Sequence, residues 1–392
     1  MTAPAQSANA GTMTPSPNPP TPNAPANAPR MKPWIEAMHA YVPGKAKADG
    51  VPVVAKLSSN ENPWGPSPAA VAAMQTVLAE GHRYPDPAST ALRTALGAKH
   101  GVEPAHIICG TGSDEILHMI ASAFAGPGDE IIHVRHGFAV YEGATRRVGA
   151  TPVVVPDVDY TADVGAILDA ITPATRIIYL ANPNNPTGTL LPAADIRRLI
   201  AGVPTDVILV LDCAYAEFVD EDYEDGLALA QGLPNLIVTR TFSKIHGLAA
   251  QRIGWAVAPL PIIAALDRVR GPFNVTTTGQ AAAVASLRDD AHIAMVRDET
   301  IRLRQWLAGE IAALGNAGLR AIPSACNFIL VEFPETGPVN AAACNEWLLE
   351  RGIICRYLAV QNMPRTLRIS IGTEAETQAV AGALRAFVES AG

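Results

Sequence analysis

The sequence has no run rich in Lys and Arg, and its formal net charge is −8. Proteins that bind nucleic acid or an anionic membrane surface carry a basic patch, so we expect neither partner, and any anion bound here should be small. The chain also lacks an apolar run as long as a membrane span, and its first residues have neither the charged nor the apolar region of a signal peptide. We therefore expect a soluble, cytoplasmic protein.

Cysteine is scarce, and its spacing argues against metal binding. The chain has five cysteines, an odd number, with no C-x-x-C pair and no ligand spacing that includes His. Such a set predicts neither a disulfide framework nor a zinc site, and it fits a reducing compartment. The five are Cys109, Cys213, Cys326, Cys344 and Cys355. We expect no metal ion in the functional site.

Apolar residues make up 48% of the 392 residues, which is enough for one large domain and a smaller one. Residues 1–30 are rich in Pro and Ala and nearly free of large apolar side chains, which predicts a disordered tail. We expect an N-terminal arm and part of the small domain in residues 31–80, the large domain in residues 81–285, and the C-terminal small domain in residues 286–392.

Strands and helices are expected to alternate through the large domain, with strands at 130–134, 151–156, 176–181 and 207–211. This alternation predicts an α/β domain with a mainly parallel sheet covered by helices on both faces. Beyond residue 255 the pattern predicts helices at 261–269, 274–287 and 298–314, then strands at 327–332 and 367–371 around a helix at 341–351. Before the large domain, it predicts a helix at 31–42 and a strand at 51–57.

The stretch Thr241–Trp255 holds one lysine, Lys244, and one arginine, Arg252, between two apolar runs. A lysine buried between strands loses hydration, which lowers its pKa and frees the amine to attack an aldehyde. The hydroxyls of Thr241 and Ser243 and the guanidinium of Arg252 are suited to hold a phosphate dianion. On local sequence alone, a surface turn with an ordinary lysine and arginine is the alternative.

A second candidate phosphate site is the glycine-rich segment 110–115, which leads into a helix expected at 116–124. Backbone N–H groups near Ser113 and Asp114 would be unpaired at the start of that helix, and the Ser113 hydroxyl adds another donor. The alternative is a helix cap without a ligand.

Polar segments follow two of the expected strands, at residues 182–188 and 212–215. Both should lie where ligands collect, at the carboxyl ends of parallel strands. The turn-rich segment 59–66 and Tyr84, which precedes a proline, are expected outside the sheet. Plain connectors, a strand-end cap at Asp212 and a surface position for Tyr84 are the alternatives.

Several motifs follow one another along the chain: SNENP at 59–63, RYPD at 83–86, NPNNPTG at 182–188, DCAY at 212–215, SK at 243–244 with GLAAQRIG at 247–254, and LRISIGT at 367–373. Together they resemble the fold-type I aminotransferases, which depend on pyridoxal 5'-phosphate (PLP), and within them the histidinol-phosphate aminotransferase group. The resemblance runs from about Lys32 to Phe387. It implies a large domain with a mainly parallel sheet covered by helices, a smaller α+β domain, PLP as cofactor and a homodimer.

The resemblance also implies roles for individual residues. Lys244 would bind PLP through its amine and then move a proton between substrate and cofactor, and Asp212 would pair with the pyridine nitrogen. Tyr215 and Asn185 would hydrogen-bond the phenolic oxygen, and Phe138 would stack on the ring, although a core aromatic is the simpler explanation for that phenylalanine. The cofactor phosphate would be held by Ser113, Asp114, Thr241, Ser243 and Arg252, with Tyr84 reaching it from the neighbouring subunit.

The implied reaction transfers an amino group between histidinol phosphate and 2-oxoglutarate in histidine biosynthesis, giving imidazole acetol phosphate and glutamate. Arg368 would bind the α-carboxylate of glutamate with its planar fork. Histidinol phosphate has no carboxylate, so its phosphate would occupy the same region, with Arg356 as a second cation and Asn185 and Tyr84 completing the substrate set. For Arg356 the alternative is an exposed arginine at a strand end.

Other functions use the same motifs. An aromatic amino-acid aminotransferase would keep the catalytic residues but line the side-chain pocket for an uncharged ring. A PLP-dependent decarboxylase of a phosphorylated amino acid would keep Lys244 and release carbon dioxide. A PLP-binding regulator would need an attached DNA-binding domain with basic helices, and the tail before Arg30 is not such a domain.

Overall fold

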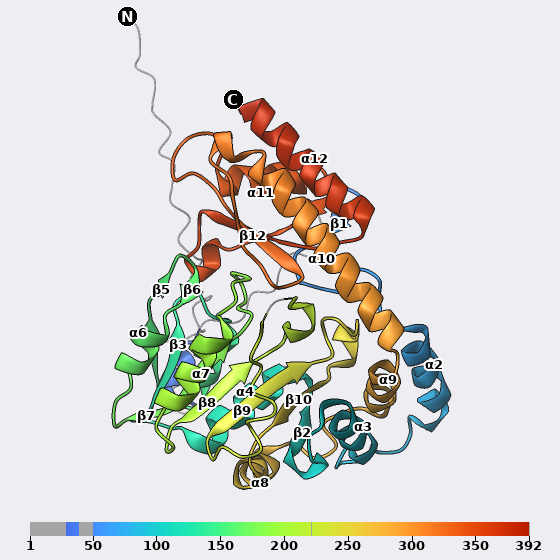
Figure 1. The fold of residues 1–392 in the computed structure, drawn as a ribbon, viewed down its shortest axis with the longest axis vertical. Coiled ribbons are helices and arrows are strands. Elements are labelled where there is room, and N and C mark those ends of the chain that lie inside the picture. The colour runs from blue at the N-terminus through green and yellow to red at the C-terminus, as the bar shows by residue number, and fades with distance from the viewer. Residues whose placement is uncertain (1–28, 39–49, 221, 392) are drawn as a thin grey trace, which may run out of the picture.

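The computed structural model describes residues 29–38, 50–220 and 222–391. Its larger unit is built on a seven-stranded sheet of order β2-β10-β9-β8-β7-β3-β4 (Figure 1). Strands β9, β8, β7, β3 and β4 are parallel, while β10 is antiparallel to both β9 and β2. The bounds are β2 Ile107–Gly110, β3 Glu130–Val134, β4 Thr151–Val155, β7 Thr175–Ala181, β8 Ile208–Asp212, β9 Leu236–Thr241 and β10 Gly254–Val257. The sheet confirms the predicted α/β class.

Successive residues of these strands belong to different apolar clusters. In β7, Ile178 and Leu180 pack in one cluster, whereas Ile177 and Tyr179 pack in another on the opposite face. Helices α2 Pro68–Val77, α3 Thr90–His100, α6 Val164–Asp169, α7 Ala193–Gly202 and α9 Thr277–Leu287 contribute to the first cluster. Helices α4 Gly112–Phe124, α5 Val140–Arg147 and α8 Leu260–Val269 contribute to the second. Because both faces are buried, the strands are continuous apolar runs.

The smaller unit contains a four-stranded antiparallel sheet of order β11-β12-β15-β14. Its strands are β11 Arg320–Ile322, β12 Phe328–Glu332, β14 Arg356–Tyr357 and β15 Thr366–Ser370, and helices α11 Ala341–Leu349 and α12 Glu374–Ala391 pack with it. Two further strands, β1 Ala55–Lys56 and β13 Ile353–Ile354, pair in parallel, so part of the segment 31–80 joins this unit.

Helix α10, Asp290–Ala312, runs between the two units (Figure 1). Its Val296 packs beside residues of the larger unit, and its Leu303 lies in the core of the smaller one. The predicted start at residue 298 is wrong. The Asp289 side chain accepts a hydrogen bond from the backbone N–H of His292 at 3.2 Å, and this cap begins the helix at Asp290.

Other differences concern short elements. The helix predicted at 31–42 is limited, among the described residues, to α1 Pro33–Glu36, and residues 39–42 lie outside them. The strand predicted at 51–57 is limited to β1, where pairing with β13 ends after two residues. An antiparallel hairpin, β5 Asp157–Val158 and β6 Thr161–Ala162, and helix α12 were not predicted. The predicted tail falls on residues 1–28, outside the described residues, and on the first two described ones.

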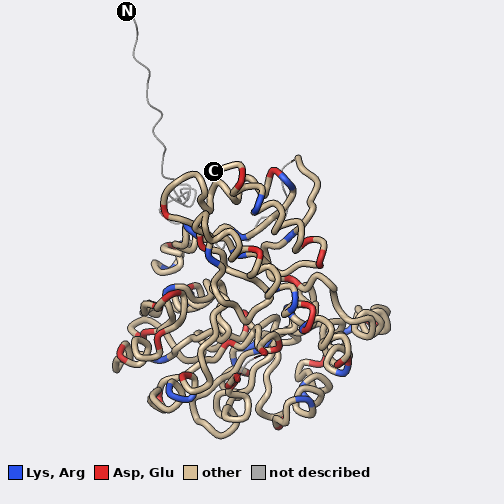
Figure 2. The backbone as a smooth tube through the Cα atoms, turned by 45° about the horizontal axis from the view of Figure 1, so that its top comes forward, with Lys and Arg blue, Asp and Glu red and all other residues tan. Residues whose placement is uncertain are grey.

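The division at residues 31–80, 81–285 and 286–392 stays a proposal. Helix α2 lies against α9 (Figure 1), so residues 68–77 pack on the larger unit although they belong to the proposed arm segment. Basic and acidic residues are interspersed along the described chain (Figure 2). No helix in the described ranges is long and apolar enough to cross a membrane. Within the same ranges, no group of three or more His, Cys, Asp or Glu side chains could hold a metal ion.

Candidate active site

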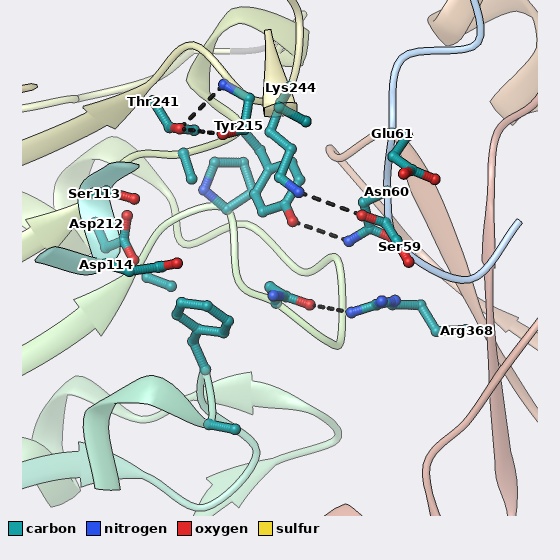
Figure 3. A pocket seen from close by; sticks show the side chains of 18 of the residues that line it. Ser59, Asn60, Glu61, Ser113, Asp114, Asp212, Tyr215, Thr241, Lys244 and Arg368 are labelled. Carbon is teal, nitrogen blue, oxygen red and sulfur yellow. Dashed lines mark hydrogen bonds between the residues drawn. The ribbon is translucent and has the colours of Figure 1, made fainter. Parts of the chain in front are cut away.

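A cavity of about 300 Å³ lies between the two units, at the carboxyl ends of β7, β8 and β9 (Figure 3). Parallel strands expose loop residues and unpaired backbone groups at this edge, which is why ligands bind there. Every predicted site residue except Tyr84 lines the cavity: Ser113, Asp114, Phe138, Asn185, Asp212, Tyr215, Thr241, Ser243, Lys244, Arg252, Arg356 and Arg368. Segments distant in sequence therefore converge as the strand-end argument predicts.

Lys244 lies in the turn that leaves β9, and its side chain points into the cavity (Figure 3). Its Nζ donates to the carbonyl oxygen of Ser59 at 3.5 Å and lies 5.7 Å from the centroid of the Tyr215 ring. Burial, and then the positive charge of Arg368, lower the pKa of Lys244 to about 8. The amine is therefore much easier to deprotonate than that of an exposed lysine.

Asp212 ends β8 and is buried, with 3% of its surface exposed. The Tyr141 hydroxyl donates to its Oδ2 at 2.9 Å, and the Thr239 hydroxyl donates to its Oδ1 at 3.0 Å. Burial raises the pKa of Asp212 to about 6, although both hydrogen bonds lower it. Neutral hydroxyls thus hold a buried carboxyl whose charged form is favoured further by any cationic ligand in the cavity.

The start of α4 and the end of β9 meet around Arg252. Its Nη1 donates to Ser243 Oγ at 3.3 Å, and its Nη2 approaches Asp114 Oδ2 at 3.4 Å. Thr241 donates from Oγ1 to Ser243 Oγ at 3.1 Å. A Cβ atom on Gly112, which has φ +81°, would lie 2.5 Å from Arg252 Nη2. Glycine therefore allows the guanidinium to approach the first turn of α4, where unpaired N–H groups favour an anion.

The Tyr215 hydroxyl accepts a hydrogen bond from Asn60 Nδ2 at 2.9 Å. Asn60 is held in turn by Ser370, whose Oγ accepts from its backbone N–H at 2.9 Å and donates to its Oδ1 at 3.0 Å, and by Asn327, whose Nδ2 donates to its carbonyl oxygen at 3.1 Å. The Tyr215 ring meets Phe328 edge-on, with the ring centroids 5.4 Å apart. Contacts from the smaller unit thus fix the tyrosine over the cavity.

Two arginines of the small sheet face the same cavity. Arg368 of β15 donates from Nη1 to Asn185 Oδ1 at 2.6 Å and from Nη2 to the Ser58 carbonyl oxygen at 3.0 Å. Arg356 of β14 is the direct cross-strand partner of Arg368, and both side chains are buried. Like charges opposite one another on a sheet are destabilising, so this pair is suited to an anion with more than one negative charge.

Phe138 and Tyr84 have different positions. Phe138 lines the cavity, with its ring edge-on to Tyr141 and the centroids 5.7 Å apart. Tyr84 is 82% exposed and stacks on Phe273, with the centroids 4.5 Å apart. Within this chain Tyr84 does not reach the cavity, so its proposed role needs a second subunit.

Several residues with direct contacts in the site were not predicted as site residues, among them Asn60, Tyr141 and Thr239. The turn-rich segment 59–66 was the signal available for Asn60. Tyr141 lies in helix α5 and Thr239 in strand β9, and nothing in their local sequence marks their hydroxyls as partners of Asp212.

Comparison with known proteins places the chain in a family. The family described as aminotransferase class I and II matches residues 52–384. The chain belongs to the class I and II aminotransferases. It is 54% identical over 360 residues to the histidinol-phosphate aminotransferase of Sphingopyxis alaskensis, covering 91% of this chain and 96% of the relative. It is 50% identical to that of Ruegeria pomeroyi, covering 92% and 98%.

A solved structure agrees with these relatives. The crystal structure of histidinol-phosphate aminotransferase from Sinorhizobium meliloti in complex with pyridoxal-5'-phosphate has a TM-score of 0.86 to this aminotransferase. The two are 30% identical, and the match covers 93% of this chain and 99% of the other. The likeness therefore extends over both units.

Proposed function

We propose that this aminotransferase uses PLP to transfer an amino group between histidinol phosphate and 2-oxoglutarate, in the pathway of histidine biosynthesis. The observation that supports this choice best is the direct pairing of Arg356 with Arg368 across β14 and β15, on the wall of the cavity that holds Lys244. One arginine is enough for a carboxylate, whereas two suit a phosphate dianion. The relatives named above carry the same activity in their names.

The cavity fits PLP by the chemistry of its side chains. Lys244 and the buried carboxyl of Asp212 both line the cavity (Figure 3). The Ser243 and Arg252 side chains, which hydrogen-bond one another at 3.3 Å, form an anion cradle with the start of α4. Because Gly112 has no side chain, the Arg252 guanidinium can lie beside the first turn of α4. Bound PLP would supply an aldehyde for the lysine amine and a ring that withdraws electrons from the reacting carbon.

The chain's own residues would then act at defined atoms. Lys244, with its lowered pKa, would take a proton from the substrate carbon that bears the amino group and return it to the cofactor side. Asp212 would hold a proton on the ring nitrogen, and the Tyr141 and Thr239 hydroxyls would keep the carboxylate oriented. Tyr215 and Asn185 would hold the phenolic oxygen, and Phe138 would cover the ring.

The substrate anion would bind against the small sheet. Arg368 is oriented by Asn185 and Ser58, so its fork is fixed before a substrate arrives. The carboxylate of glutamate and the phosphate of histidinol phosphate would use this arginine in turn, and Arg356 would contribute mainly to the dianion. We propose a homodimer in the cytoplasm, with Tyr84 completing the cofactor phosphate site and the substrate site of its partner.

A panel of half-reactions tests the proposal. The purified holoenzyme is mixed with histidinol phosphate, glutamate, tyrosine or phenylalanine, and the change in cofactor absorption is followed together with any carbon dioxide released. We expect fast reactions with histidinol phosphate and glutamate and no carbon dioxide. A preference for tyrosine or phenylalanine would instead support the aromatic aminotransferase, and carbon dioxide would support the decarboxylase.

The variant Arg356→Leu tests the specificity assignment within the same assay. We expect kcat/KM for histidinol phosphate to fall by about a hundredfold, the size of a lost charge-assisted contact, and kcat/KM for glutamate to fall far less. Arg351→Leu is the control, because Arg351 also lies in the small unit but outside the cavity, stacked on Trp347 at 3.3 Å. Equal losses on both substrates would contradict the role of Arg356.

A further inference from the structure

The β5–β6 hairpin of the larger unit projects onto the sheet of the smaller unit. Its two turn residues, Asp159 and Tyr160, both have positive φ, at 45° and 65°. A left-handed backbone is unfavourable for a residue as bulky as tyrosine and persists only where surrounding contacts hold it. The contacts around this turn therefore indicate what the conformation is for.

The hairpin tip is fixed by ion pairs and a hydrogen bond to β11 and β12. Asp159 accepts a bidentate contact from Arg320, at 3.0 and 2.7 Å, and Arg320 also contacts Glu332 at 2.9 Å. The Tyr160 hydroxyl donates to Glu332 at 2.8 Å, and the Arg320 guanidinium lies 5.7 Å from the centroid of the Tyr160 ring. These four side chains from the two units thus form one connected group, which Arg365 joins through a contact with Glu332 at 3.4 Å.

The hairpin packs on the same row of the small sheet that carries the two arginines. The cross-strand register joins Ile322 to Leu330, Leu330 to Arg368, and Arg368 to Arg356. Directly paired residues of an antiparallel sheet point to the same face, so these four side chains share one face. The Tyr160 ring packs against the apolar end of the row, with Ile322 and Leu330, and the substrate cavity uses the other end.

On its other side, Tyr160 is tied to the segment that carries Asn185. The Tyr160 carbonyl oxygen accepts from Thr189 Oγ1 at 2.9 Å, and Thr189 and Thr187 share a hydrogen bond of 2.9 Å. Thr187 accepts from Asn184 Nδ2 at 2.8 Å, and the next residue, Asn185, holds Arg368. Tyr160 is therefore linked to the segment of Asn185 by a short chain of hydrogen bonds and to Arg368 by the packing of its ring on the cross-strand row.

The Tyr160 ring also lies 5.5 Å from the ring of His136, whose Nδ1 contacts Asp157 of the same hairpin at 2.8 Å. His136 begins the segment that leads to Phe138 in the cavity. Beside the hairpin, a cleft of about 800 Å³ lined in part by Asp159, Thr189 and Ile322 separates the units. The hairpin thus connects the two units at the edge of this cleft, and it is not part of a continuous packed interface.

We infer that Tyr160 is a positioning residue for the substrate anion: the β5–β6 turn holds the row Ile322–Leu330–Arg368–Arg356 at a set distance from Asn185 and Phe138. This inference rests on the proposed function for the identity of the substrates, while the geometry concerns any substrate anion that binds Arg368. Lys244, Asp212 and the Arg252 cradle all belong to the larger unit. Weakening the contacts of the β5–β6 turn with the small sheet should therefore change substrate binding and leave PLP binding unchanged.

The test uses the holoenzyme with Tyr160→Phe, which removes only the hydroxyl bonded to Glu332, and Asp159→Asn, which weakens the pairing with Arg320. The control is Val158→Ala on the same hairpin, where the side chain is 66% exposed. We expect KM for glutamate to rise about fivefold or more in both variants with kcat within about twofold, the pattern of lost binding that is uniform between ground and transition states. The control should match the wild type.

Two further measurements separate positioning from general damage. The affinity of the apoprotein for PLP should be unchanged, and the binding of inorganic phosphate to the holoenzyme, measured by calorimetry, should weaken in parallel with glutamate. A double-mutant cycle of Tyr160→Phe with Glu332→Ala should be strongly non-additive, because each substitution removes the hydrogen bond between the Tyr160 hydroxyl and the Glu332 carboxylate.

The outcomes are distinct from those of the proposed function. An unchanged KM for glutamate in both hairpin variants overturns the inference, as does a loss of PLP affinity that parallels the rise in KM. A wild-type enzyme that reacts with glutamate but not with histidinol phosphate overturns the proposed function alone, because the hairpin is judged on glutamate.

Discussion

Lys244 depends on its surroundings for its reactivity, because an amine with an ordinary pKa is almost wholly protonated near neutral pH. Because burial lowers the pKa of Lys244 to about 8, its side chain is largely a free amine at moderately alkaline pH. We expect the apoprotein to capture PLP at a rate that rises with pH and levels off above about pH 8, followed by visible absorption in stopped flow.

The variant Lys244→Ala should lose both this absorption and the transaminase activity. Lys56→Ala is a suitable control, because Lys56 lies close to the cavity but pairs with Glu61 at 2.6 Å and borders the neighbouring pocket. Retention of the absorption and the activity by Lys244→Ala would remove the lysine from its role.

Asp212 makes the apoprotein sensitive to pH in a direction that follows from its burial. Its folded-state pKa, about 6, is raised above the ordinary 3.8, so the folded protein binds this proton more tightly than the unfolded chain does. The associated stabilisation, about 3 kcal/mol, is fully present below about pH 4 and is lost as pH rises through about 6.

We therefore expect Asp212→Asn to stabilise the apoprotein against urea at pH 8 relative to the wild type, and to do so much less near pH 4.5. In the holoenzyme the same substitution should lower kcat by about a hundredfold or more, since a preorganised charge at the cofactor ring is lost. Asp114→Asn is the control for stability, because that carboxylate is 44% exposed. A constant difference at both pH values would contradict the raised pKa.

At the scale of elements, β10 packs closely against the first turn of α4, where we propose that the cofactor phosphate binds. A Cβ atom on Gly254 would lie 2.2 Å from the backbone nitrogen of Ser113 and 2.4 Å from the carbonyl carbon of Gly112. We expect Gly254→Ala to displace the first turn of α4, to destabilise the protein by about 1–3 kcal/mol, and to weaken PLP binding by about tenfold or more.

The matched control is Gly271→Ala, because a Cβ atom on Gly271 meets no atom within 4 Å. PLP affinity measured by fluorescence quenching, together with urea unfolding, distinguishes the two variants. If Gly254→Ala binds PLP as tightly as the control does, the start of α4 does not contribute to the phosphate site.

Much of the larger unit could be predicted because its signals are local. The strand Ile208–Asp212 is a continuous apolar run ending in a polar residue, so both its burial and the place of Asp212 at the sheet edge follow from the sequence. The hairpin at Asp157–Ala162 could not be predicted in this way. Its turn has neither Gly nor Asn at the positions of positive φ, and contacts with Arg320 and Glu332, far along the chain, hold it.

The site residues likewise divide into those with a local sequence signal and those placed by contacts between distant segments. Lys244 and Arg252 lie in one motif. Tyr141, in contrast, donates its hydroxyl to Asp212 from a helix 71 residues away in sequence, and nothing in the sequence distinguishes it from a tyrosine of the core. Arg356 faces the cavity because of its pairing with Arg368, and this register is a property of two strands together. Contacts between segments distant in sequence account for what the motifs leave out.

For the molecule as a whole, Tyr84 and Phe273 form an exposed aromatic stack. In the proposed dimer, Tyr84 would complete the site of the second subunit. A dimer with two-fold symmetry builds two equivalent sites from two chains. We expect Lys244→Ala and Tyr84→Ala, each inactive or nearly so, to recover activity after they are unfolded and refolded together. With random exchange at equal amounts, about half of the dimers are mixed and about a quarter of all sites are intact.

Mixed dimers carrying two different affinity tags can be isolated and assayed directly. Refolding of Lys244→Ala with wild-type chain is the control for the yield of mixed dimers. Mixed dimers of the two variants that stay as inactive as their parents would show that Tyr84 does not act across an interface.

The pairing of β14 with β15 has a consequence for engineering. Arg356 and Arg368 point to one face only in the register that pairs them directly, and residues 358–365 connect the two strands. A slip of one residue would turn Arg356 to the opposite face without any change in its identity. A protein engineer could therefore change the preferred substrate anion by varying the length of this connection. Both arginines would still be present in the sequence of such a variant, so the sequence would not reveal the change.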